Sequence, residues 1–175
     1  IRILRPGPEA GPRVTAAAPA GSNLAAMPRL LMACSTVADA SGMMGAIAPL
    51  AIQLARQGFD VRLAGPVGAT ERPIAAEQAS GVLIDVWLRR LFSVPPLADA
   101  WNAASCVANF ASHGSPAVVH VHGVWTAANA AACVRSRTLG IPYVVSPHGM
   151  LLPAAMHRSG LKKRCAMGAF VRRNL

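Results

Sequence analysis

Short apolar runs alternate with segments of helical periodicity along most of the chain, and this alternation limits the folds available to it. Runs of strand length lie at 28–35, 60–65, 81–87, 117–123 and 142–149. Helices are expected over 43–59, about 98–112 and about 126–139. Strands joined by helices of this length form parallel sheets through right-handed crossovers. The alternation therefore predicts an α/β fold with a Rossmann-like, doubly wound parallel sheet.

The first expected helix carries one favourable and one unfavourable signal. Gly58 follows its last apolar position and suits the left-handed residue after a helix. Pro49 lies inside it, where proline costs about 3 kcal/mol. We therefore expect this helix to start late or to bend at Pro49.

The two ends of the chain differ from its middle. Residues 1–26 are rich in Ala, Pro and Gly without strand or helix periodicity, so we expect them to be disordered. Met27 directly precedes the first strand, and one hypothesis makes it the natural start. Residues 27–175 are expected to form one domain. The final helical pattern runs to Leu175 without a terminating glycine or proline, which predicts a domain truncated at that end.

The charge balance is strongly basic. Seventeen Lys and Arg face seven Asp and Glu, and Asp99 is the last acidic residue. Most basic residues after it lie between residues 158 and 173, a cluster that would attract phosphate, anionic lipid or nucleic acid, or would simply form a solvated helix face. Only Phe170 is an aromatic residue within this cluster, so a nucleic-acid partner is disfavoured. No apolar run is long enough to cross a membrane.

Cysteines and common catalytic motifs exclude several classes of protein. The four cysteines form no CxxC pair, which disfavours zinc and disulfide frameworks and fits a reduced cytosolic compartment. The chain has no GxSxG elbow and no phosphate-binding GxxxxGK[ST] loop, and its glycine loop at 42–45 does not match GxGxxG. If the protein is an enzyme, we therefore expect its chemistry to need groups from outside this chain.

Three histidines fall at the ends of neighbouring strand-like runs. His120 and His122 lie in HVHG and share one face, while His148 ends the run in SPHG. Ligands of doubly wound sheets bind beyond the carboxyl ends of the strands. These histidines are therefore candidates for a functional site, although packing or capping roles remain open. A three-histidine metal site is disfavoured because no nearby carboxylate would orient the rings.

Several of these stretches together resemble a known family. The segments VVHVHGVW, GIPYVVSPHGMLLP and LKKRCAMGAFVRRNL, with the earlier ASGMMGAIAPLAIQLARQGFDVRLAGP, are similar to the amino-terminal domain of glycosyltransferase family 4. The resemblance covers roughly 28–175 and is weak over 66–116. It implies one half of a two-domain GT-B enzyme, in which this domain binds the acceptor and a second domain holds most of the donor.

The resemblance also implies roles for particular residues. His148 would be the catalytic residue facing the donor sugar, Gly42 and Gly149 would bind the donor, and His122 and Trp125 would line the acceptor side. The family usually has adjacent glycines in its first loop, whereas Met43 and Met44 follow Gly42 here. The basic residues expected to face a membrane are Lys162, Lys163, Arg164, Arg172 and Arg173.

The expected function follows from these roles. The resemblance implies a retaining hexosyl- or related glycosyltransferase that uses a nucleotide-diphosphate sugar as donor substrate, with no metal and no cofactor. Its acceptor would be a glycan or lipid-linked molecule in polysaccharide, lipopolysaccharide or glycolipid assembly. We expect a cytoplasmic protein, peripheral on the inner face of an anionic membrane, that is inactive without its carboxy-terminal donor domain. The alternative is a non-catalytic Rossmann-like ligand-binding domain.

Overall fold

The computed structural model describes most of the chain between Met27 and His157, together with a few residues at either end. The described residues are 2–3, 27–38, 41–68, 81–88, 95–113, 117–157, 163, 165 and 167–171. All four cysteines are free thiols.

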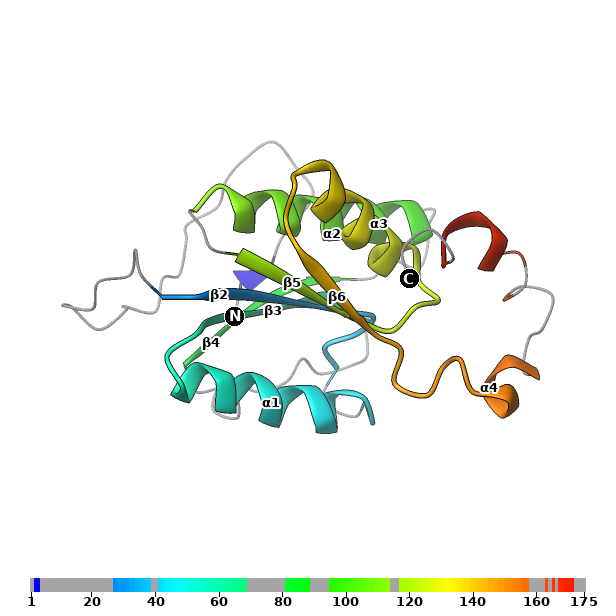
Figure 1. Ribbon diagram of the computed structural model, residues 1–175, viewed down its shortest axis with the longest axis horizontal. Helices are drawn as coiled ribbons and strands as arrows, with labels where there is room; N and C mark the ends of the chain where they lie inside the picture. Colours follow the sequence, from blue (N-terminus) through cyan, green and yellow to red (C-terminus); the bar gives the residue numbers. More distant parts are fainter. Residues whose placement is uncertain are drawn as a thin grey trace.

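A single parallel sheet forms the centre of the domain (Figure 1). Its strands are β1 (Arg2–Ile3), β2 (Arg29–Cys34), β3 (Asp60–Val67), β4 (Val82–Leu88), β5 (Ala117–His122) and β6 (Tyr143–Ser146). They lie in the order β1-β4-β3-β2-β5-β6, and every neighbouring pair is parallel. The parallel sheet predicted from the alternating runs is confirmed.

Helices cover both faces of this sheet. Helix α1 (Met44–Arg56) lies on one face, and α2 (Pro95–Ala111) and α3 (Ala127–Thr138) pack together on the other (Figure 1). The short helix α4 (Pro153–His157) and the π-helix η2 (Met167–Val171) lie beyond the end of the sheet where α1 and α3 begin. Among the helices of the described residues, none combines the length and apolarity that spanning a membrane would need.

Two hydrophobic cores explain why the strands are apolar throughout. Met32 and Cys34 of β2 pack toward α1, whereas Leu31 and Ala33 pack toward α2 and α3. Successive strand residues point to opposite faces, so a strand covered on both sides needs apolar residues at every position.

The strand order reverses between β2 and β5, which places a topological switch point there. The crossover after β2 passes through α1 on one face, while α2 and α3 connect the following strands on the other. The loops that follow β2 and β5 therefore separate, and ligands of such sheets bind in the crevice between them.

The chain after β2 is held close to β3. The N–H of Val37 donates to the carbonyl oxygen of Pro66 at 3.0 Å. A Cβ atom at Gly65 would lie 2.9 Å from the carbonyl oxygen of Cys34, so only glycine fits this contact. The first loop thus leaves the sheet in a fixed direction toward the start of α1.

The ends of α1 and α2 refine the sequence prediction. Gly58 has φ 90° and ends α1 as predicted. The late start is wrong, because α1 begins at Met44 and contains Pro49. Helix α2 begins at Pro95, earlier than predicted, because proline is favourable in a first helical turn, where its missing N–H has no intrahelical partner.

Strand β6 is shorter than the run that predicted it. It ends at Ser146, and Pro147 follows, which lacks the N–H needed to continue the ladder. His148 therefore lies in a turn two residues beyond the strand.

The predicted disorder of residues 1–26 can be compared with the structure only at Arg2 and Ile3. These two residues form β1, which pairs with Asp85 and Val86 of β4, so at this point the structure shows a strand. The rest of the segment lies outside the described residues.

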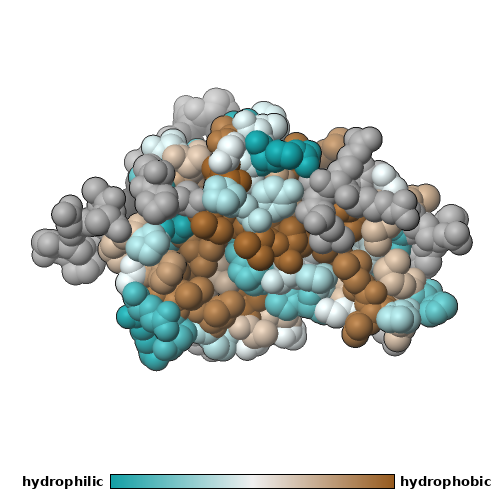
Figure 2. Space-filling model, viewed as in Figure 1, coloured by the Kyte–Doolittle hydropathy of each residue, from teal (hydrophilic) through white to brown (hydrophobic). Residues whose placement is uncertain are grey.

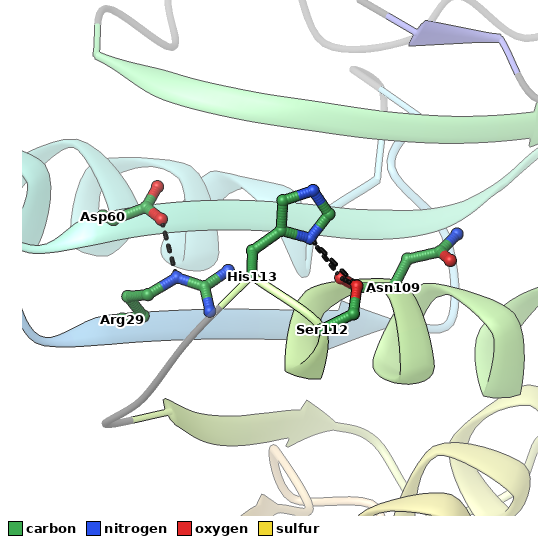
Figure 3. A network of polar contacts seen from close by, with 5 residues as sticks. All are labelled: Arg29, Asp60, Asn109, Ser112 and His113. Carbon is green, nitrogen blue, oxygen red and sulfur yellow. Dashed lines mark hydrogen bonds and ion pairs between the residues drawn. The ribbon is translucent and has the colours of Figure 1, made fainter. Parts of the chain in front are cut away.

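Polar contacts lie at the amino end of the sheet, opposite to the switch-point edge (Figure 3). Arg29 of β2 forms an ion pair with Asp60 of β3 at 3.1 Å and lies over the ring of Phe110. His113 hydrogen-bonds through Nδ1 to the carbonyl oxygen of Asn109 at the end of α2. These contacts join strand starts to a helix end, and we assign them a structural role.

Candidate functional site

Two neighbouring strands bring the predicted histidines together. His120 and His122 of β5 lie on the same sheet face as Met32 and Cys34 of β2, which they oppose in register. Their ring centroids are 4.0 Å apart. Because β6 pairs with β5, the turn after β6 places His148 beside His122, with centroids 5.1 Å apart.

The SPHG turn holds His148 in an unusual backbone conformation. The N–H of Met150 donates to the carbonyl oxygen of Pro147 at 2.9 Å, and both central residues have positive φ, 45° at His148 and 74° at Gly149. Positive φ at both positions is typical of a type I′ turn. No other non-glycine residue of the described chain has positive φ. Such strain costs roughly 1–3 kcal/mol and is concentrated at functional sites.

One hydrogen bond joins His122 to His148, and another joins His120 to β6. Nδ1 of His122 lies 2.8 Å from Nε2 of His148, and Nε2 of His120 lies 2.7 Å from Oγ of Ser146. The His122 ring stacks on that of His148 and lies tilted against that of His120. His122 is only 1% exposed, whereas His148 is exposed. The row of rings thus runs from the sheet to the surface and ends at His148.

The pKa values of the two inner histidines of this row are lowered. Burial, with smaller contributions from His120 and His148, lowers the pKa of His122 from 6.5 to about 3. Burial also lowers the pKa of His120, helped by the nearby His148. Cys34, opposite His122, is a poor nucleophile because burial raises its pKa to about 12.

The start of α3 fixes the end of β5. Thr126 caps α3 by accepting a hydrogen bond from the N–H of Asn129 at 3.2 Å, and Nδ2 of Asn129 donates to the carbonyl oxygen of His122 at 2.9 Å. Gly123 has φ 95°, and a Cβ atom there would lie 3.0 Å from Nδ2 of Asn129. Three side-chain atoms here are buried without a partner, namely His122 Nε2, Trp125 Nε1 and Asn129 Oδ1.

The start of α1 lies at the same edge of the sheet. Its N-cap, Met43, makes no side-chain cap bond, and its first turn contains no acidic residue. A Cβ atom at Gly42 would meet nothing within 4 Å, and its φ is not positive, so internal packing gives no reason for glycine there. The N–H groups of Met44 and Gly45 donate to the carbonyl oxygen of Ser41, at 2.9 and 3.3 Å. The dipole of the helix still favours an anion at its start.

Of the basic residues predicted to face a membrane, the structure describes only Lys163. Lys163 is half-buried, and its Nζ donates to the carbonyl oxygen of Ala155 and lies 5.6 Å above the ring of Trp125. The other predicted membrane-facing residues, Lys162, Arg164, Arg172 and Arg173, lie outside the described residues.

The histidine row is not arranged as a metal site. Within the described parts of the chain, no group of three His, Cys, Asp or Glu side chains could hold a metal ion. The bond between His122 and His148 already occupies one nitrogen of each ring.

The sequence of the chain matches a known protein family. A model of the glycosyl transferase 4-like domain matches residues 41–175. The chain belongs to this family. The family resemblance seen in the HVHG and SPHG segments is thereby confirmed, and the chain is a domain of a glycosyltransferase family.

Solved structures of other proteins have a fold similar to that of this domain. A putative UDP-N-acetylglucosamine 2-epimerase from Listeria monocytogenes matches with a TM-score of 0.50 and 14% identity, over 81% of this chain and 37% of the epimerase. UGT2 of Phytolacca americana, complexed with UDP-2-fluoro-glucose and pterostilbene, matches with a TM-score of 0.53 and 15% identity, over 79% of this chain and 35% of UGT2. The chain thus spans little more than a third of either enzyme. A search of curated proteins finds no match.

A third solved structure separates fold from activity. The C-terminal domain of a hydrogenase from Pyrococcus furiosus matches with a TM-score of 0.53 and 11% identity, over 69% of this chain and 91% of that domain. The Rossmann-like sheet alone therefore does not specify a reaction, and function has to be argued from the site.

Sequence reasoning found the histidines but missed the residues that hold them. The structure brings His120, His122 and His148 together, while Gly42 lies at the same edge without a direct bond to them. Ser146 and Asn129 were missed. Thr126, directly before the α3 pattern, is a recognisable N-cap signal that pointed to this corner.

Proposed function

We propose that this chain is the acceptor-side half of a retaining glycosyltransferase that uses a nucleotide-diphosphate sugar and is inactive alone. The observation that carries the proposal is the strained, exposed His148 at the switch-point edge of a glycosyl transferase 4-like domain. Strain at an exposed polar residue is retained where it serves binding or chemistry.

His148 is proposed to contact the donor sugar next to its anomeric carbon. In the reaction, the bond from that carbon to the diphosphate oxygen breaks, and a bond to an acceptor hydroxyl oxygen forms. Gly149 lets the backbone turn so that His148 faces the crevice. Trp125 is proposed to line the acceptor side. It follows His122 by three residues, is half-buried and lies close to Lys163.

The diphosphate is proposed to lie against Gly42 at the start of α1. The dipole of this helix and basic side chains of a second domain would stabilise the negative charge that develops on the leaving group. We propose that this stabilisation needs neither a metal nor a cofactor.

A second domain is proposed to follow the described sheet. Strand β6 is an edge strand among the described residues, and Val144 on it is 54% exposed. Figure 2 shows hydrophobic side chains gathered across the middle of this face, between the layer of α1 and the layer of α2 and α3. An exposed apolar surface of this kind is typical of contact with further protein.

Attachment to an anionic membrane is proposed as the means of reaching a glycan or lipid-linked acceptor. Besides the basic cluster, Leu97 and Trp101 are 68% and 74% exposed one turn apart on α2, and tryptophan is favoured at membrane surfaces. Flotation with phosphatidylcholine vesicles, with and without phosphatidylglycerol, tests this proposal. Arg172→Gln/Arg173→Gln should weaken binding to the anionic vesicles about thirtyfold, and equal binding to both vesicle types contradicts it.

The function itself is tested by reading the coding sequence beyond Leu175 and expressing the extended protein. We expect an open frame for about 150 to 200 further residues and transfer of sugar from a nucleotide sugar. His148→Asn should reduce transfer at least about tenfold, because asparagine tolerates positive φ but lacks the imidazole. His113→Asn, at the opposite end of the sheet, is the control and should leave transfer unchanged.

Two outcomes would overturn the proposal. One is a stop codon directly after Leu175 with no transfer by the chain, which would favour the alternative of a solitary ligand-binding domain. The other is transfer that His148→Asn leaves unchanged, which would remove His148 from the site.

A further inference from the structure

His122 is the most enclosed polar side chain near the crevice, although the family resemblance implied that it faces the acceptor. The residue is 1% exposed, and its ring contacts those of His120 and His148. A side chain this buried has little surface to offer a substrate. Its Nδ1, however, lies 2.8 Å from Nε2 of the exposed His148, so it acts on the crevice through that neighbour.

Between two singly protonated imidazoles, a hydrogen bond can be formed in only two ways. Either Nδ1–H of His122 donates to Nε2 of His148, or Nε2–H of His148 donates to Nδ1 of His122. The second arrangement would place the proton of His122 on its own Nε2.

The burial of Nε2 of His122 distinguishes between the two arrangements. Nε2 of His122 is buried and has no partner among the described residues. An orphaned buried N–H is rarer in native proteins than an acceptor left without a donor. The first arrangement leaves only a lone pair at that atom, so His122 carries its proton on Nδ1 and donates it to His148.

We propose that His122 is a positioning residue that holds His148 in the Nδ1–H form, so that His148 presents its Nδ1–H as a hydrogen-bond donor beyond the carboxyl ends of the strands. Nδ1 of His148 makes no bond to any part of the chain that the structure describes, and it is free to meet a ligand. Such a donor fits a hydroxyl or ether oxygen of a sugar. This choice of ligand rests on the proposed function, whereas the proton positions rest on the geometry alone.

His120 and Ser146 help to hold the His122 ring in place. Nε2 of His120 bonds to Oγ of Ser146 at 2.7 Å, and the His120 ring packs against His122. The contact with His120 limits rotation of the His122 ring and so helps to keep Nδ1 aimed at His148.

Long-range ¹H–¹⁵N NMR of the imidazole rings tests the proton positions directly in the full chain at pH 7.5. We expect His148 to be protonated on Nδ1. His113 serves as an internal reference, because its Nδ1 faces the carbonyl oxygen of Asn109 and must carry a proton. A wild-type His148 protonated on Nε2 would overturn the proposal whatever the variants do.

Two substitutions of His122 separate positioning from general support of the fold. In His122→Asn, the amide nitrogen is as many bonds from Cβ as Nδ1 is, so the donor is kept and His148 should stay in the Nδ1–H form. In His122→Leu, the donor is lost, and His148 should shift to the Nε2–H form that a free histidine favours. Unchanged His148 signals in a folded His122→Leu variant would contradict the proposal.

Affinity for UDP-glucose, UDP-N-acetylglucosamine and GDP-mannose then tests the link to function. For a nucleotide sugar that binds, His122→Leu should weaken affinity about tenfold, and His122→Asn should stay within about threefold of the wild type. If the proton positions hold but none of the three binds, the proposed function fails while the positioning role stands. If a sugar binds but His148 carries its proton on Nε2, the positioning role fails alone.

Discussion

At the scale of the residue, the site combines a strained histidine with a buried one. His148 accepts an unfavourable positive φ, and His122 sits neutral beneath it with one nitrogen unpaired. Both arrangements cost stability and neither is needed to close the sheet. Their occurrence on two hydrogen-bonded neighbours points to selection for a ligand.

The neutrality of His122 predicts how stability changes with pH. Its pKa is about 3 in the folded chain and close to 6.5 when unfolded, so below pH 6.5 the unfolded state binds more protons. The free energy of unfolding should therefore fall as pH drops from about 6.5 toward 3, by up to about 1.4 kcal/mol per pH unit from this residue.

Urea unfolding of the wild type and of His122→Asn at pH 7.5, 6 and 5 measures this contribution. The variant has no imidazole at this position, so the wild type should lose more stability than the variant on acidification. A stability difference between the two that stays constant with pH would show that His122 is not held neutral.

At the scale of the element, the site depends on where strands and helices begin and end. The carboxyl end of β5 is fixed by the α3 cap, through Thr126 to Asn129 and from Asn129 to His122. The carboxyl end of β6 is fixed by Pro147 and the turn that follows. His148, the proposed catalytic residue, thus lies on a short turn that follows a strand.

The cap at Thr126 gives a prediction for α3. Thr126→Ala removes the hydrogen bond to the N–H of Asn129 and should lower the free energy of unfolding by about 1 kcal/mol. Thr138→Ala is a matched control at the other end of the same helix, where the hydroxyl is exposed and donates to the carbonyl of Arg135. Urea unfolding compares the two. Equal losses would mean that the Thr126 bond does not cap the helix.

Sequence patterns predicted the elements better than their ends. Strands β2 to β5 agree with the predicted runs within a few residues, because burial on both faces of the sheet makes the apolar pattern of a strand continuous. Helix α3 also agrees with its predicted range. The start of α2 and the end of β6 were missed by about three residues, since proline signals a boundary without saying on which side it lies. The bond between His122 and His148 depends on the register of β5 and β6, which no local pattern specifies.

At the scale of the whole molecule, the chain is a Rossmann-like domain with a marked asymmetry between its two ends. Its amino edge is closed by Arg29, Asp60 and Phe110, while its carboxyl edge gathers the histidine row, the start of α1 and the segments after β6 (Figure 1). Ligands of doubly wound sheets bind beyond the carboxyl ends of the strands. We therefore place every proposed ligand contact at the carboxyl edge.

The central claim is that this edge binds a nucleotide sugar through His148 and Gly42. It is tested most directly by NMR titration of this chain with UDP-glucose, UDP-N-acetylglucosamine and GDP-mannose, following imidazole and backbone amide signals. We predict saturable shifts at His148 and Gly42 with at least one of the three, at a dissociation constant of about 1 mM for the single domain, and no shift at His113. No shift at His148 and Gly42 with any of them, or shifts confined to the amino edge around His113, would contradict the account.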